Sequence, residues 1–130
     1  MVWKPHLFQD YAINFNALLR KETLWSVAYA VTYIWVPEVR TGLHLHIGSD
    51  DEARVYLNGR LLYHHDSPRP LAVDEDTVKH VELQAGLNVV VFKVMNEEQG
   101  WQGSLRFANA DDTVVKGLKV TLDPNRRDNP

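Results

Sequence analysis

The strongest constraint on the fold is a run of strict alternation near the N-terminus, WSVAYAVTYIWV at residues 25–36. Large apolar and aromatic side chains fall on one face, at every second residue from Trp25 to Trp35, and mostly small or polar side chains fall on the other. A period of two with this β-branched and aromatic content predicts a β-strand. The small residues of the second face indicate that another layer packs closely against it. Pro37 ends the predicted strand, because proline has no N–H to donate to a neighbouring strand.

Further segments with apolar runs of this kind follow, separated by turn signals. Residues 13–15 fit either a single strand or one helical turn. The dipeptide Asn58-Gly59 predicts a type I′ hairpin turn with positive φ at both positions. About eight short strands without a convincing helix predict an all-β sandwich or barrel. The predicted strands after residue 37 are LHLHI (43–47), ARVYL (53–57), RLLYH (60–64), VKHVEL (78–83), LNVVVFKVM (87–95), WQGSLRFAN (101–109) and GLKVTL (117–122).

Length and charge narrow the class of protein. The 130 residues fit one domain, predicted over residues 1–124 with a polar tail at 125–130. Cysteine is absent, which excludes disulfides and thiolate metal sites. The net charge of −3 offers no electropositive footprint for nucleic acid, and no apolar stretch approaches the roughly 20 residues of a membrane span. The first residues lack the pattern of a signal peptide. We therefore expect either a protein that is not exported or a segment of a longer exported one, which would place it outside the cell or in the periplasm.

Three segments in this order resemble a known domain class. They are the alternating strand that ends near Pro37, then IGSDDEARVYLNGRLLY at 47–63 and LQAGLNVVVFKVMNEEQGWQGSLRF at 83–107. The chain resembles, over residues 25–108, the galactose-binding-like jelly-roll domains found beside bacterial glycoside hydrolases and in surface proteins. It also resembles the sugar-binding domain named for the anthrax protective antigen. The resemblance implies an antiparallel jelly-roll β-sandwich that serves as a non-catalytic carbohydrate-binding module, joined to catalytic or surface domains.

The resemblance also implies a calcium site. In the second domain class, adjacent aspartates before the hairpin bind calcium, and the matching residues here are Asp50 and Asp51. The glycine that usually follows the pair is replaced by Glu52. Calcium takes six to eight oxygen ligands, and two consecutive carboxylates reach one ion only through an unusual backbone, such as a cis peptide.

Other residues join this prediction if the 48–52 and 96–100 loops lie at one end of the sandwich. Asn96 and Glu97 would then add oxygen atoms to a calcium or glycan site. The alternative is that Ser49, Asp50 and Asp51 form an Asx-type turn, in which side chains satisfy loop amides.

Two further residues are candidates for contact with a glycan. An exposed Trp101 indole would stack on a sugar ring, whereas a buried one would cover an end of the core. Arg54 is a candidate donor to sugar hydroxyls or carboxylates, as is Arg69. Arginines of this kind also lie over apolar surface with the charged group in water.

A rival pattern is His44-Leu45-His46, whose histidines share one face of a strand. With Glu52 they resemble the first motif of the cupins, which are metal-dependent jelly-roll enzymes, but the second cupin motif is missing. The alternative is that both histidines face solvent on the wet side of an antiparallel sheet. His64-His65-Asp66 offers a further set of ligand types without a defined geometry. No arrangement typical of a catalytic site stands out, so we expect a protein that is not an enzyme.

Overall fold

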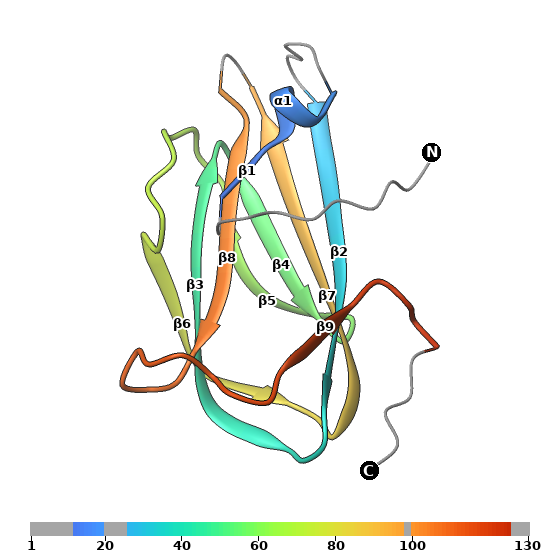
Figure 1. The fold of residues 1–130 in the computed structure, drawn as a ribbon. Coiled ribbons are helices and arrows are strands. Elements are labelled where there is room, and N and C mark those ends of the chain that lie inside the picture. The colour runs from blue at the N-terminus through green and yellow to red at the C-terminus, as the bar shows by residue number, and fades with distance from the viewer. Residues whose placement is uncertain (1–11, 20–25, 98–99, 126–130) are drawn as a thin grey trace.

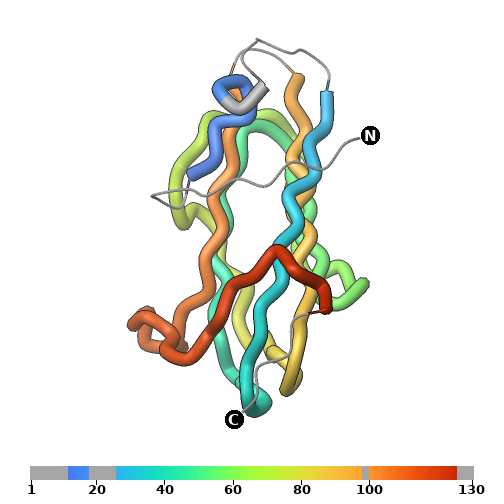
Figure 2. The backbone as a smooth tube through the Cα atoms, turned by 45° about the vertical axis from the view of Figure 1, so that its right-hand side comes forward, coloured from blue at the N-terminus to red at the C-terminus, as the bar shows by residue number. Residues whose placement is uncertain are grey.

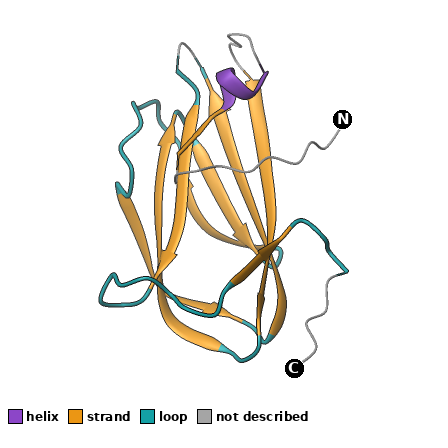
Figure 3. Ribbon diagram, in the orientation of Figure 1, coloured by secondary structure: helices purple, strands orange, loops and turns teal. Residues whose placement is uncertain are grey.

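A computed structural model describes residues 12–19, 26–97 and 100–125. Strands dominate these residues, and the one helix is a short turn at one end of the molecule (Figure 3). The elements are β1 (Ala12–Asn14), α1 (Phe15–Leu19), β2 (Ser26–Val36), β3 (Arg40–Asp50), β4 (Ala53–Leu57), β5 (Arg60–His65), β6 (Asp76–Leu83), β7 (Gly86–Asn96), β8 (Gln102–Ala108) and β9 (Lys119–Thr121) (Figure 1). The predicted all-β fold is confirmed, and both expectations for residues 13–15 are met in part, since β1 runs directly into α1.

The strands form two antiparallel sheets packed face to face (Figures 1 and 2). One sheet has four strands in the order β1-β8-β3-β6, and the other has five in the order β5-β4-β7-β2-β9. From β2 onward every connection except the β4–β5 hairpin crosses from one sheet to the other, as the chain of a jelly roll does. The last crossing is visible in Figure 2, where the segment after β8 passes over to β9 beside β2.

The alternation at 25–36 orients β2 as predicted. Its small residues Ala28 and Ala30 pack against the core, and its aromatic face points outward, with Tyr29 41% exposed. Within its own sheet β2 pairs with β7 along its whole length. Trp25 lies outside the described residues. The core between the sheets comes from inward residues of the central strands: Leu43, Leu45 and Ile47 on β3, Val55 and Leu57 on β4, and Val90, Phe92 and Val94 on β7.

The predicted hairpin turn is confirmed, with φ of 52° at Asn58 and 81° at Gly59. A buried amide supports this end of the sandwich. Asn88 accepts a hydrogen bond from the Asn58 side chain (2.9 Å) and donates to the Gln84 carbonyl (2.9 Å). The polar side chain of Asn88, near the start of β7, is therefore satisfied although it is fully buried. Across the described ranges, no helix is long and apolar enough to cross a membrane.

Candidate functional site

The end of the sandwich that carries α1 brings two acidic segments together (Figure 1). The Asp51 amide donates to the Met95 carbonyl (2.9 Å), and the Met95 amide donates to the Glu52 carbonyl (2.8 Å). The Glu97 amide donates to Oδ2 of Asp51 at 2.7 Å. The expectation that the two acidic loops share one end is therefore confirmed. We call the carboxyl groups of Asp50, Asp51, Glu52 and Glu97 the acidic rim.

Three of the four carboxyl groups of the acidic rim converge. Asp51, Glu52 and Glu97 each place one carboxylate oxygen within 4.8 Å of the others. The peptide bond between Asp50 and Asp51 is cis. Burial, together with the Asp51 carboxyl beside it, raises the pKa of Asp50 to about 6. The rim is therefore a place where negative charge is unfavourable unless a proton or a cation offsets it.

The donor atoms of the rim fit calcium. All four side chains offer carboxylate oxygen, the ligand type that calcium prefers. Oε2 of Glu52 is buried and has no hydrogen-bond partner among the described residues. Asp51 itself is only 6% exposed. One oxygen each from Asp51, Glu52 and Glu97 would give three ligands. A six- to eight-coordinate ion would therefore keep positions for the Asp50 carboxyl, for water or for oxygen atoms of a bound molecule.

A surface hollow of about 340 Å³ lies beside the rim. Its wall combines acidic and amide groups with two apolar side chains, and Asn96 contributes to it although that residue is only 1% exposed. The structure thus places both Asn96 and Glu97 next to the aspartate pair. The lining residues are Ser26, Val27, Glu52, Met95, Asn96 and Glu97.

Arg69 supports the rim from behind instead of facing a ligand. Its side chain is 10% exposed and donates to the carbonyl and the hydroxyl of Ser49, at 3.1 Å each, and to Asp76 at 2.8 Å. The Ser49 hydroxyl in turn donates to the Asp51 carbonyl (2.7 Å). In the predicted local turn, the side chain that bonds the backbone is therefore that of Ser49. The Asp51 carboxylate instead accepts a hydrogen bond from the Glu97 amide of the facing segment. Arg69 is a positioning residue, and no sequence spacing connects it to Ser49.

The prediction of an exposed Trp101 indole is wrong. Trp101 is 2% exposed, packs against Phe15 of α1 with ring centroids 5.3 Å apart, and donates its indole N–H to the Val94 carbonyl (3.2 Å). The ring is buried because the residue just before β8 points between the sheets, where α1 covers it. The alternative, that Trp101 covers one end of the core, is the correct one.

Arg54 lies on the outer face of the five-stranded sheet. Its cross-strand neighbours are Lys93 on β7 and His64 on β5. The Arg54 Nε is buried and has no hydrogen-bond partner within the part of the chain that the structure describes. Its role as a ligand donor stays a prediction.

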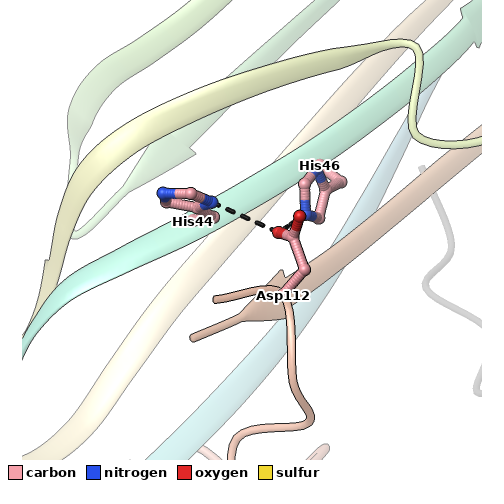
Figure 4. Close-up of side chains that lie close together, drawn as sticks. All are labelled: His44, His46 and Asp112. Carbon is pink, nitrogen blue, oxygen red and sulfur yellow. Dashed lines mark hydrogen bonds and ion pairs between the residues drawn. The ribbon is translucent and has the colours of Figure 1, made fainter. Parts of the chain in front are cut away.

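The ligand set His44, His46 and Glu52 is wrong. His44 precedes Asp50 by six residues on β3, a span of about 20 Å, and Glu52 belongs to the acidic rim. The histidines do not face open solvent either, since their side chains are 15% and 8% exposed. Asp112, from the segment after β8, lies over both of them (Figure 4). Spacing does not point to this aspartate, because it follows the histidines by more than 60 residues.

His64 and Asp66 form an exposed pair at 2.6 Å, in which His65 takes no part. His65 accepts or donates a separate bond with Ser67 at 3.2 Å. Among the described residues, this segment contributes to neither group of three or more metal-ligand side chains.

Comparisons with family models, curated proteins and solved structures found no match for this chain. The resemblance to the sugar-binding jelly rolls therefore stays a prediction.

Proposed function

We propose that this chain is a non-catalytic carbohydrate-binding module that binds its glycan at the acidic rim with the help of calcium. The observation that carries the proposal is the convergence of three carboxylates, those of Asp51, Glu52 and Glu97, at one end of the sandwich, with the Asp50 carboxyl beside that of Asp51. The hydrogen bonding of the loops explains only part of this arrangement, since the Glu97 amide requires one carboxylate oxygen and not three converging carboxylates. The sequence resemblance to calcium-dependent sugar-binding domains supports the same conclusion.

Each part of the site has a separate task in this proposal. Asp50, Asp51, Glu52 and Glu97 supply the oxygen ligands of the ion. A bound calcium would supply open coordination positions that accept neutral oxygen, such as neighbouring hydroxyl groups of a sugar. Val27 and Met95, in the hollow beside the rim, offer an apolar wall for the C–H face of a sugar ring.

Ser49 and Arg69 hold the segment that carries Asp50 and Asp51 in place through hydrogen bonds on its inner side. By analogy with the domains that it resembles, the module would act while joined to a catalytic or surface domain.

A glycan panel tests the proposal directly. The chain is applied with millimolar calcium and again with a chelator, alongside the variants Glu52→Gln and Asp66→Asn. We expect binding to a limited set of glycans that the chelator and Glu52→Gln abolish. Asp66→Asn is the matched control, because Asp66 is an exposed carboxylate in another loop. Failure to bind any glycan, with calcium binding intact, would reject the carbohydrate part of the proposal.

A second candidate function is a structural or protein-interaction domain without a sugar site. The shielded Trp101 favours it, because the aromatic platform expected of many sugar sites is absent at that position. In this case the acidic rim would only order the two loops. The discriminating result is a chain that neither gains stability from calcium nor binds any glycan.

A further inference from the structure

A second group of ligand side chains lies away from the acidic rim. His44 and His46 extend from β3 on the outer face of the four-stranded sheet, and both rings point toward Asp112 (Figure 4). Nδ1 of His44 lies 3.3 Å from Oδ1 of Asp112, and Nε2 of His46 lies 2.9 Å from the same oxygen. The ring centroids are 6.0 Å apart with the planes nearly perpendicular. One nitrogen of each imidazole therefore lies close to the same carboxylate oxygen above the sheet.

The aspartate is held in this position by its own turn. The Asp112 amide donates to the Asn109 carbonyl (2.8 Å), and the Asn109 amide donates to the Thr113 carbonyl (2.9 Å). Asp111 accepts hydrogen bonds from the amide and hydroxyl of Thr113, at 3.1 and 2.5 Å. Asp112 itself adopts φ of 64°, a conformation that aspartate tolerates in turns. The carboxylate is thus presented by a braced loop and not by a free side chain.

We propose that His44, His46 and Asp112 form a binding site for a divalent transition metal, with zinc as the best fit. Two imidazole nitrogens and one carboxylate are a ligand set that zinc takes in proteins and that calcium and magnesium do not prefer. Four tetrahedral ligands at about 2.0–2.1 Å from zinc lie about 3.3 Å from one another. The nitrogen-to-oxygen separations of 3.3 and 2.9 Å are close to that value. Small side-chain shifts would therefore admit the ion.

The other ring nitrogen of His46 has the partner that a metal ligand needs. Nδ1 lies 2.8 Å from the Thr77 hydroxyl, and Thr77 is its cross-strand neighbour on β6. With a metal on Nε2, the proton resides on Nδ1 and is donated to Thr77. Without the metal, Nε2–H can donate to Asp112, and Nδ1 accepts from the hydroxyl instead. A threonine hydroxyl serves both tautomers because it donates and accepts, and such outer partners orient metal-binding histidines.

The charges around the site are compatible with a cation. Arg106 on β8 is the cross-strand neighbour of His46, and its guanidinium is paired with Asp74 at 2.8 Å. The Asp112 side chain is 59% exposed, which leaves the outer side of the site open to a water ligand.

Calorimetric titration with zinc tests this site, in millimolar calcium so that the acidic rim is occupied if it binds an ion. We expect one zinc ion per chain. His44→Gln and Asp112→Asn should each weaken binding at least tenfold. His64→Gln is the matched control, because His64 also contacts an aspartate but has no second imidazole in its group. It should leave the affinity unchanged.

A positioning variant covers the case in which a ligand variant does not fold. Thr77→Val retains all three ligands and should weaken zinc binding about tenfold to a hundredfold, the effect typical of losing an outer-shell partner. Circular dichroism of each variant confirms that it is folded. Absence of zinc binding by the wild-type chain, or equal binding by His44→Gln, Asp112→Asn and the wild type, would overturn the proposal. Neither result bears on the calcium site.

Discussion

The acidic rim predicts an unusual substitution, Asp50→Asn, that stabilises the calcium-free protein. Burial and the adjacent Asp51 carboxyl raise the pKa of Asp50 to about 6 from a model-compound value of 3.8. The folded chain therefore binds this proton more tightly than the unfolded chain does. The contribution of the carboxyl to stability is most favourable below about pH 4 and is lost progressively as pH rises to about 6.

The magnitude follows from the same shift. A difference of about 2 pKa units corresponds to about 3 kcal/mol of destabilisation above pH 6. Part of the Asp50 side chain reaches solvent, and its charge is shared with Asp51, so we expect Asp50→Asn to recover about 1–2 kcal/mol at pH 7.5. The amide of asparagine is neutral and can still donate to the Asp51 carboxylate, which keeps the geometry of the pair.

Urea unfolding of wild type and Asp50→Asn, in chelator and at several pH values between 4 and 8, measures this effect. The variant should be the more stable protein at pH 7.5, and the two curves should meet near pH 4. Asp66→Asn, in an exposed loop, should show no comparable gain. A variant that is less stable than wild type at pH 7.5, or a gain that does not change with pH, would refute the reasoning.

Three further substitutions test the structural roles assigned above. Trp101→Phe removes the indole hydrogen bond and some core volume, so it should cost about 1–3 kcal/mol in urea unfolding and leave glycan affinity unchanged; altered glycan selectivity would contradict its core role. Asn88→Ala leaves several buried hydrogen-bonding groups without a partner and should lower the free energy of unfolding by about 2–4 kcal/mol in the same assay. A loss below about 0.5 kcal/mol would contradict the role assigned to the Asn88 hydrogen bonds. Asp76→Asn should cost about 1 kcal/mol at pH 7. Tyr63 and Arg69 hydrogen-bond the Asp76 carboxylate and lower its pKa, so the loss should shrink as pH falls below about 4; a loss that is the same at pH 3 would contradict this assignment.

Much of the fold could be predicted because its signals are local. The alternation of residues 25–36, the Asn-Gly turn and the regular turn spacing each depend on neighbours in the chain, and the structure confirms them. The convergence of the acidic segments was predictable too, since a sandwich collects loops at its two ends. Asp51 and Glu97 meet there across 46 residues of sequence.

The errors arise where tertiary packing decides. Trp101 stands between a loop and β8, a position that fits an exposed or a buried indole, and only the position of α1 shows that its ring is covered. The alternation of the β3 histidines with leucines predicts that they face solvent, but Asp112 reaches them from a segment distant in the sequence and covers them. Arg69 reaches Ser49 through the fold alone. No pattern in a single sequence encodes such contacts.

Calcium binding to the metal-free chain tests the central claim most directly, with Glu52→Gln measured beside the wild type. We predict that the wild type binds one ion per chain, with a dissociation constant of about 10⁻⁴–10⁻³ M, as extracellular calcium modules do. At a calcium concentration 100 times that constant, the unfolding free energy should rise by about 2.7 kcal/mol. Glu52→Gln should lose both effects. No saturable binding at millimolar calcium, or an identical isotherm for the variant, would contradict the account.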